Sequence, residues 1–179
     1  MIYLFLAEGF EEIEALCPLD LMRRAGLSVT TVGVGGREIT GAHGITVLAD
    51  ASEEDLVPTS AEMIVLPGGM PGTLNLANSP TVLRAVERAH REGAYLAAIC
   101  AAPSILGDLG LLKGKEAVCF PGFEDRLIGA TLSDRRVVRD GRVITAAGMG
   151  VALDFGLALV EALLGVERAR ELREAVLAD

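Results

Sequence analysis

The sequence predicts an α/β fold in which a doubly wound, mostly parallel sheet carries helices on both faces. Two observations predict it. First, short and wholly apolar runs recur along the chain at Ile2–Leu6, Met63–Leu66 and Tyr95–Ile99, and such runs are typical of strands buried on both faces of a sheet. Second, stretches with the helical spacing of apolar residues separate these runs, as the crossovers between parallel strands require.

In the first half of the chain, a helix is predicted over Glu11–Arg24, directly after the first strand, and a glycine ends it. Leu27–Val34 is predicted as the next strand. Arg37–Leu48 is interrupted by two glycines and is predicted to form a hairpin, or an excursion, that leaves the main sheet. Met63–Leu66 then continues the series of buried strands.

The second half continues the alternation. An Asn-Ser-Pro sequence at 78–80 predicts the start of a helix that runs to Glu92, where Gly93 follows as its stop. An Asp-Gly pair at 140–141 predicts a hairpin turn. The other predicted elements are a helix at Ala101–Leu109, the hairpin strands Val137–Arg139 and Val143–Ala146, and helices at Val151–Leu164 and Glu167–Leu177.

Length and composition limit the class of protein. A chain of 179 residues, of which 51% are hydrophobic, predicts a single domain over residues 1–179. The net charge of −9 argues against nucleic acid or an anionic membrane as partner. Three cysteines make no disulfide framework, and no cluster predicts a metal site. Because Met1–Phe10 lacks a basic region and a long apolar run, we expect a cytoplasmic protein with reduced thiols.

Three segments are expected to meet at one edge of the sheet. Ala7–Glu14 follows the first strand, Pro67–Gly72 follows Met63–Leu66, and Cys100–Pro103 follows Tyr95–Ile99. Ligands of doubly wound sheets bind beyond the carboxyl ends of the strands. We therefore expect the chemistry of the protein where these three segments converge.

Cys100 is the candidate nucleophile. It occupies a strand-to-helix turn, with the small residues Ala98 and Ala102 two positions away on either side, and the turn is similar to a nucleophile elbow. At a helix N-terminus, the dipole and free N–H groups favour a thiolate, so we expect a thiol pKa well below about 8.5. Most free cysteines are small buried hydrophobes, and this is the alternative for Cys100.

Glu14 is the candidate partner of this thiol. At about 100° per residue, it falls on the apolar face of the first helix, between Pro18 and Leu21. Burial there would raise the pKa of the carboxyl group and keep it protonated, so that it could donate a hydrogen bond to a thiolate. The alternative is an ordinary acidic residue in the first turn of a helix.

Backbone amides and histidines complete the candidate site. The N–H groups of Gly69 and Ala101 could form an oxyanion site. Of the two histidines, His90 is expected at the opposite edge of the sheet, and His43 lies in the Arg37–Leu48 hairpin. Neither makes an obvious Cys-His dyad, which weakens a protease-like reading. The two remaining cysteines are expected to pack in the core: Cys17 and Cys119.

Several ordered segments resemble the ThiJ/PfpI superfamily, and most closely the branch that holds the parkinsonism-associated deglycase and bacterial YajL. The similarity covers nearly the whole chain and rests on Ala7–Glu14, Met22–Gly26, Val65–Gly69, Ala98–Pro103, Phe120–Asp125 and Asp154–Phe155. The resemblance implies a flavodoxin-like three-layer sandwich of the class I glutamine amidotransferase type, usually a homodimer. It also implies that Cys100 is the nucleophile, Glu14 its protonated partner, and Gly69 and Ala101 the oxyanion donors.

The resemblance further implies a cofactor-free enzyme of the glyoxalase or deglycase type, whose substrate is a small α-oxoaldehyde or a glycated protein. Around the pocket it places Gly68, His43, Arg24 and Phe120. The chain departs from this branch in two places: Phe120 stands where a histidine is expected, and Ala147 where an arginine is. His43 stands where relatives carry an arginine near the dimer seam, and Ala101 follows Cys100 where the peptidase branch has a histidine.

Two other functions stay open on the sequence alone. The first is a non-enzymatic redox sensor or stress chaperone, in which Cys100 is oxidised to a sulfinate that Glu14 holds. The second is a hydrolase of the amidotransferase or peptidase type. This last function needs a histidine base within reach of Cys100, and the spacing offers none.

Overall fold

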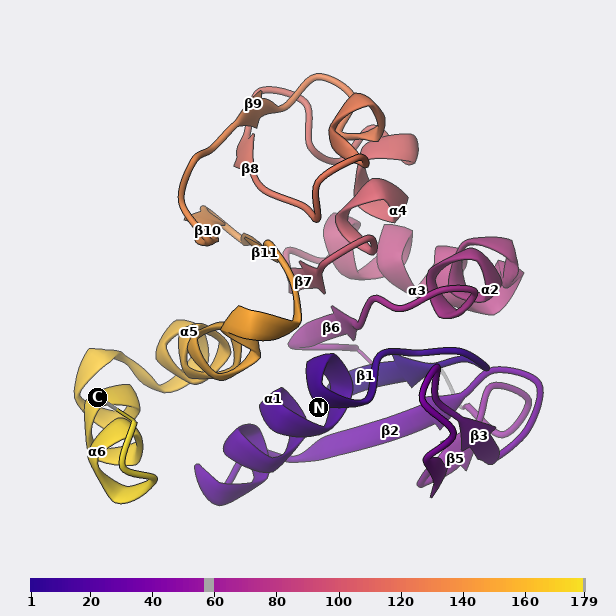
Figure 1. The fold of residues 1–179 in the computed structure, drawn as a ribbon, viewed down its shortest axis with the longest axis horizontal. Coiled ribbons are helices and arrows are strands. Elements are labelled where there is room, and N and C mark those ends of the chain that lie inside the picture. The colour runs from indigo at the N-terminus through magenta and orange to yellow at the C-terminus, as the bar shows by residue number, and fades with distance from the viewer. Residues whose placement is uncertain (57–59, 179) are drawn as a thin grey trace.

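The structure is a computed structural model and describes residues 1–56 and 60–178. Its main sheet contains β1 (Ile2–Leu6), β2 (Val29–Gly33), β5 (Ala51–Ser52), β6 (Met63–Leu66), β7 (Tyr95–Ile99), β10 (Val137–Asp140) and β11 (Val143–Ala146). These seven strands lie in the order β10-β11-β7-β6-β1-β2-β5 (Figure 1). Among the described residues of this sheet, β10 and β11 are antiparallel and the other neighbouring strands are parallel. The predicted fold class is confirmed.

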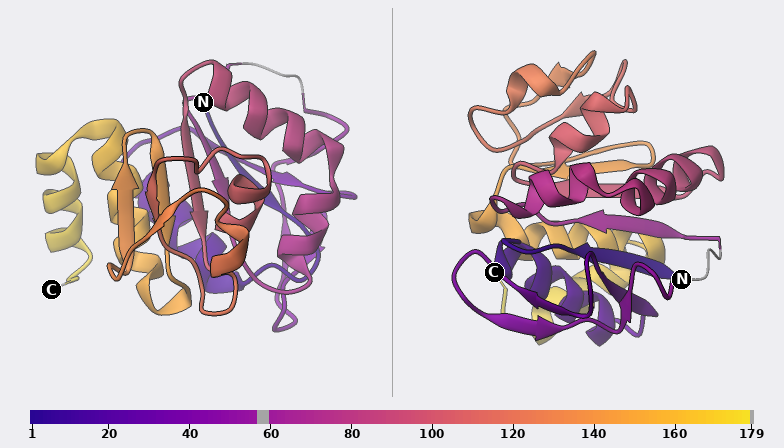
Figure 2. Two further views of the ribbon diagram at one scale, coloured as in Figure 1. Left: turned by 90° about the horizontal axis from the view of Figure 1, so that it is seen from above. Right: turned by 90° about the vertical axis from the view of Figure 1, so that its right-hand side faces the viewer.

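Helices cover both faces of this sheet, as two views of the molecule show (Figure 2). One face carries α1 (Glu12–Arg24), α5 (Ala152–Leu164) and α6 (Val166–Ala175); the other carries α2 (Gly72–Asn78), α3 (Pro80–Arg91) and α4 (Pro103–Asp108). Successive residues of a strand point to opposite faces. Accordingly Ile2 and Leu4 belong to the core under α1 and α5, whereas Tyr3 and Phe5 belong to the core under α3.

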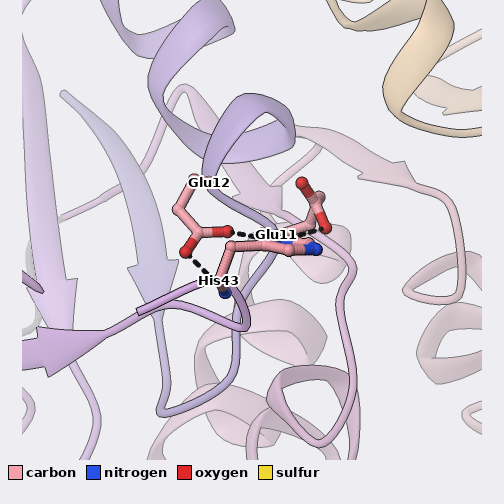
Figure 3. A group of neighbouring side chains, drawn as sticks. All are labelled: Glu11, Glu12 and His43. Carbon is pink, nitrogen blue, oxygen red and sulfur yellow. Dashed lines mark hydrogen bonds and ion pairs between the residues drawn. The ribbon is translucent and has the colours of Figure 1, made fainter. Parts of the chain in front are cut away.

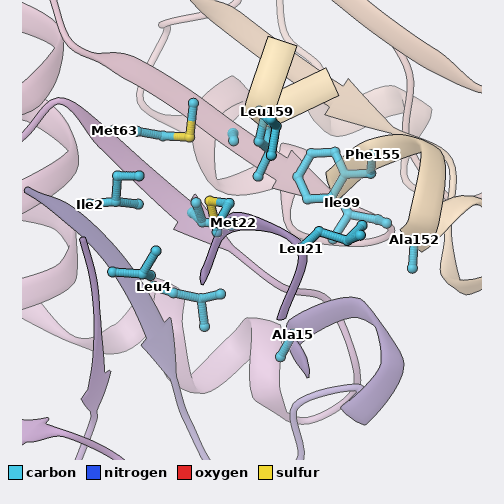
Figure 4. Close-up of a cluster of buried hydrophobic side chains, with 14 of the residues drawn as sticks. Ile2, Leu4, Ala15, Leu21, Met22, Met63, Ile99, Ala152, Phe155 and Leu159 are labelled. Atoms are coloured by element: carbon cyan, nitrogen blue, oxygen red, sulfur yellow. The ribbon is translucent and has the colours of Figure 1, made fainter. Parts of the chain in front are cut away.

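Helix α1, which carries Glu14, is held in place by the core beneath α1 and α5 (Figure 4). Met22 and Phe155 are fully buried in it. The two helices approach closely at Gly156, where an added methyl group would lie 2.6 Å from Cδ1 of Leu21 and 2.9 Å from Cα of Pro18. This close packing fixes the position of α1 relative to the sheet.

Two smaller sheets lie outside the main one. The first is the predicted hairpin, β3 (Glu38–Thr40) with β4 (Thr46–Leu48), and the second pairs β8 (Glu116–Ala117) with β9 (Thr131–Leu132). Single turns of 3-10 helix occur at Glu124–Arg126 and Met149–Val151. Among the described residues, no helix is both long enough and apolar enough to cross a membrane.

Most predicted elements form within a few residues of their expected bounds, and the exceptions have local causes. The helix expected from Ala101 begins at Pro103, because residues 100–102 make the turn out of β7. Ser79 caps α3 as its sequence predicts, with its Oγ accepting a hydrogen bond from Val82 N at 3.2 Å. Three features lack a strong periodic signal and were not predicted: α2, β5 and the β8–β9 pair.

The parallel strands bring their carboxyl ends to one edge of the sheet. Leu66 pairs in register with Ala98, and Ile99 pairs with Ala146. The loops that follow β1, β6, β7 and β11 therefore leave the sheet side by side. The three segments expected to converge do so, and the loop after β11 joins them.

Candidate active site

Cys100 occupies a strained turn directly after β7. Its φ angle is 64°, in the left-handed region that residues with a side chain rarely adopt; such a conformation costs about 1–3 kcal/mol and persists only where the surroundings enforce it. Here the backbone N–H of Cys100 donates to Ala146 O at 2.9 Å, and Phe120 N–H donates to Cys100 O at 2.8 Å. The elbow is therefore held on both sides, with the thiol half-buried.

Glu14 lies in the first turn of α1 on the face that the helical spacing predicted. Its side chain is only 1% exposed. The carboxylate oxygen Oε2 accepts a hydrogen bond from Gly68 N–H at 3.0 Å, and the carboxyl group is also hydrogen-bonded to Cys100. A carboxyl group on the apolar face of a helix thus finds its partners in the two loops that follow β6 and β7.

The two glycines after β6 are required by the close approach of these groups. A methyl group on Gly68 would lie 2.5 Å from Glu14 Oε2 and 2.6 Å from Cys100 Cβ. Gly69 has a φ of 91°, and a side chain there would meet the backbone of Glu11. With no side chain in the way, the N–H groups of Gly69 and Ala101 hydrogen-bond the sulfur of Cys100. These are the two amides that we expected as oxyanion donors; that role stays a prediction.

Burial raises the pKa of both members of the pair. It raises the pKa of Glu14 to about 7. The charge of Glu11 adds to this rise, whereas hydrogen bonds from Cys100 and from the N–H groups of Gly68 and Met149 oppose it. Burial also raises the pKa of the Cys100 thiol to about 12, together with the charge and hydrogen bond of Glu14.

The expectation of a thiol pKa well below 8.5 is therefore wrong for Cys100 beside an ionised Glu14. The N–H groups of Ala101 and Gly69 do lower this pKa, but burial and the neighbouring carboxylate outweigh them. Two such groups titrate as a pair. Cys100 and Glu14 lose one proton near neutral pH and hold the second far above it, so the pair carries a single negative charge.

Phe120 and the loop after β11 border this pair. A methyl group on Gly148 would lie 3.2 Å from the Phe120 ring and 3.9 Å from Glu14 Oε1. The Phe120 side chain is 48% exposed. As the sequence indicated, an apolar ring stands beside the site at the position where the resemblance had implied a histidine.

His43 lies at the margin of the site, in a cluster with Glu11 and Glu12 (Figure 3). Its Nδ1 is 3.0 Å from Glu12 Oε2 and 3.4 Å from Glu11 Oε2. The hydrogen bond to Glu12 and the charges of both carboxylates raise the pKa of His43. Within the described chain, these are the ligand atoms close enough to share a metal ion, at most 4.8 Å apart; their mutual pairing accounts for the arrangement without one.

Glu12 has a structural function that its position in the sequence did not reveal. Its buried Oε1 accepts hydrogen bonds from the N–H groups of His43 at 2.8 Å and Ile45 at 3.4 Å. Burial alone would raise the pKa of Glu12, but the hydrogen bonds from His43 and Ile45 lower it on balance. Glu12 thus ties the β3–β4 hairpin to the start of α1.

The structure does not bring Arg24 to the site. Arg24 lies in the last turn of α1 and forms an ion pair with Asp20, Nε to Oδ2, at 2.5 Å. Arg24 lies ten positions after Glu14 in the helix, a rise of about 15 Å along the axis. The placement of Arg24 in the pocket was therefore wrong, because the helix carries it to the opposite edge of the sheet.

The remaining histidine and cysteines lie as expected. His90 is exposed near the end of α3, before β7 begins, and so belongs to the amino edge of the sheet. Cys119 is buried in the core under α3 and α4, and Cys17 packs against the other core. Neither of the two histidines of the chain has a recorded contact with Cys100.

A mostly parallel sheet with a strained cysteine elbow and a buried glutamate defines a class of α/β protein, and comparison with known proteins identifies the family. The family model described as the DJ-1/PfpI family matches residues 1–162. In structure, a DJ-1 superfamily protein from Salmonella typhimurium is similar, with a TM-score of 0.94 and 34% identity over 99% of this chain and 98% of that one. The chain belongs to the DJ-1/PfpI family.

Curated relatives place it in the DJ-1 branch of that family. Protein DJ-1 homolog B of Arabidopsis thaliana is 38% identical over 93% of this chain, which spans only 39% of that longer protein. The Parkinson disease protein 7 homolog of Danio rerio is 36% identical, over 94% of this chain and 92% of that protein. The glutathione-independent glyoxalase DJR-1.2 of Caenorhabditis elegans is 32% identical, over 92% and 89% respectively.

Proposed function

We propose that the protein is a cofactor-independent, cysteine-dependent enzyme that converts small α-oxoaldehydes, or their early adducts with thiols and amines, to 2-hydroxy acids. The observation that carries this proposal is the buried Cys100–Glu14 pair, which shares one proton near neutral pH beside two N–H donors. A relative of 32% identity named as a glutathione-independent glyoxalase supports it. Such chemistry needs a nucleophile and one group that moves a proton.

With methylglyoxal, the reactive pair has its shared proton on Glu14 and its negative charge on the sulfur. The thiolate adds to the aldehyde carbon, and the N–H groups of Gly69 and Ala101 hold the resulting oxyanion. Glu14 gives its proton to the oxyanion, removes the proton from the former aldehyde carbon, and returns it to the neighbouring ketone carbon, while the new hydroxyl proton passes to the ketone oxygen. This yields a lactoyl thioester on Cys100, which water hydrolyses to lactate and the free thiol.

An early adduct enters the same sequence with its carrier still attached. In a hemithioacetal of methylglyoxal, the carrier thiol already occupies the former aldehyde carbon. Glu14 moves the proton from this carbon to the ketone carbon, and the hydroxyl proton passes to the ketone oxygen, which makes a lactoyl thioester of the carrier. The thiolate of Cys100 then displaces the carrier thiol, and water hydrolyses the new thioester, so no oxidant or reductant is needed.

Glu14 serves as both acid and base in this proposal. Phe120 cannot accept a proton, and His43 is engaged with Glu11 and Glu12 instead. Loss of a general acid–base group typically costs 10²–10⁴ in rate. Because neither Phe120 nor His43 can replace it, we expect the loss on changing Glu14 to lie toward the upper end of this range.

A methylglyoxal-to-lactate assay on the purified protein tests the proposal. Cys100→Ser and Glu14→Gln should each lose nearly all turnover, whereas Cys17→Ser and Glu12→Gln serve as matched controls for a thiol and a buried carboxylate outside the pair. Turnover that survives both Cys100→Ser and Glu14→Gln would overturn the proposed mechanism and point to another site or a contaminant.

A redox sensor is the second candidate function, favoured by the same hydrogen bonds around the sulfur. If Cys100 is oxidised by peroxide to a sulfinate, Glu14 and the N–H groups of Gly69 and Ala101 can hold its oxygens. In that case the wild-type protein should show no aldehyde turnover above background. Mass spectrometry after peroxide treatment should then find Cys100 oxidised, with the sulfinate less persistent in Glu14→Gln.

A further inference from the structure

A small cavity is lined by neighbours of the residues that border the Cys100–Glu14 pair. Its volume is about 230 Å³, and its wall includes Cys119, Pro121, Arg136 and Ala147. The wall is one residue away from the site in two loops: Cys119 and Pro121 flank Phe120 after β8, and Ala147 precedes Gly148 after β11. The same two loops therefore line the cavity and border the candidate active site.

Arg136 is an arginine of this wall whose side chain pairs with no other side chain of the described residues. Within residues 1–56 and 60–178, its guanidinium group has no recorded hydrogen bond or ion pair. Its neighbour Arg135 differs, because its Nη2 pairs with Glu116 Oε2 at 2.5 Å. An arginine left unpaired beside a cavity can bind a carboxylate through two parallel N–H bonds.

The backbone places Arg136 at the same edge of the sheet as Cys100. Arg136 O accepts a hydrogen bond from Ala147 N at 2.8 Å, directly before β10 begins, and Cys100 N donates to Ala146 O. Two strand spacings of about 4.8 Å thus separate the backbones of Arg136 and Cys100. The guanidinium lies over the loop between them, since a methyl group on Gly150 would be 3.2 Å from Arg136 Nη2.

We propose that Arg136 binds the carboxylate of a small carrier molecule, so that the preferred substrate is an α-oxoaldehyde adduct of a carboxylate-bearing thiol or amine. This rests on the proposed function and names its substrate class. The loop at 148–150 has Glu14 at one end and Arg136 at the other. An adduct that reacts over Glu14 and extends along this loop brings a carboxylate a few bonds away to Arg136.

Size and charge of the cavity limit the carrier further. At about 230 Å³ it is smaller than the roughly 300–1,000 Å³ that hold drug-sized ligands, which favours a carrier of amino-acid size over a protein segment. Glu124 and Asp134 also line the wall. Their negative charges disfavour a second anionic group, so a monoanionic carboxylate fits better than a phosphate dianion.

Two stable probes that differ only in charge test the proposal. S-(2-oxopropyl)-N-acetylcysteine has the carbon skeleton of the methylglyoxal adduct of N-acetylcysteine but cannot react, and its carboxamide lacks the negative charge. Each probe is titrated against the rate of iodoacetamide alkylation of Cys100, at fixed ionic strength. The wild-type protein should bind the carboxylate roughly five to ten times more tightly than the carboxamide, as for a partly exposed charge-assisted pair.

Arg136→Gln should abolish this preference, Arg136→Lys should keep part of it, and Arg135→Gln should leave it unchanged. A preference that persists in Arg136→Gln, an equal loss in Arg135→Gln, or no protection by either probe would each overturn the proposal. The readout does not depend on turnover. A carboxylate preference without methylglyoxal turnover would sustain the carboxylate site and reject the proposed reaction, and turnover without the preference would do the reverse.

Discussion

The raised pKa of Glu14 predicts how the stability of the protein depends on pH. The pKa rises from 4.5, the ordinary value, to about 7 in the folded protein. Between these values the native state holds a proton that the unfolded chain has already released. The free energy of unfolding therefore falls as the pH rises through this window. At 1.36 kcal/mol per unit, a rise of about 2.5 units corresponds to about 3 kcal/mol.

Glu14→Gln removes this titration and keeps the shape of the side chain. Between pH 4.5 and pH 8, we expect the free energy of unfolding of the variant to gain about 3 kcal/mol relative to that of the wild type. This gain does not depend on how far the two proteins differ in stability at pH 4.5. Urea denaturation of both proteins at the two pH values measures this difference. Protein concentration must be held constant, because association would also shift the apparent stability.

Glu12→Gln is the matched control, because this buried carboxyl group lies in the same turn of α1 and its pKa is lowered. A lowered pKa stabilises the native state above the unfolded value, and this stabilisation is lost as the pH falls. Glu12→Gln should therefore lose stability relative to the wild type as the pH rises, the opposite sign to Glu14→Gln. If the wild type and Glu14→Gln differ equally at both pH values, Glu14 titrates normally and its role as proton carrier fails.

Three further predictions concern the site and its surroundings. The rate of Cys100 alkylation should rise through about pH 7, where the pair loses its first proton. Mass spectrometry should find Cys100 modified before the other two thiols. A rate that rises only near pH 9 contradicts the pairing. Gly68→Ala should remove that inflection and most turnover, since its methyl group would displace Glu14; an unchanged profile contradicts the tight contact. Ile13 and Met149 are 48% and 49% exposed beside the site, and we expect them to lie in the interface of a homodimer. Sedimentation at micromolar concentration should show a dimer for the wild type and a monomer for Ile13→Glu. A monomeric wild type contradicts this.

The sequence by itself determined the fold class and the two central residues. Short apolar runs such as Tyr95–Ile99 are typical of buried strands, and the turn after this strand placed Cys100 at the ligand edge of the sheet. Helical periodicity likewise placed Glu14 on the buried face of α1. These inferences succeeded because each depends on spacing within one element, which the local order of residues specifies.

Tertiary structure alone decided the distances, burial and charges at which the elements meet. The pKa of Cys100 reflects burial and the charge of Glu14, which lies 86 positions earlier in the chain, so no local pattern could show that it is raised. Arg24 was misplaced for the same reason: its distance from the site is set by the length and direction of α1. Arg136 gave no signal in the sequence, because the pairing of β10 with β11 brings it to the site's edge. Electrostatic and packing energies depend on distances in space, and only the folded chain determines those distances.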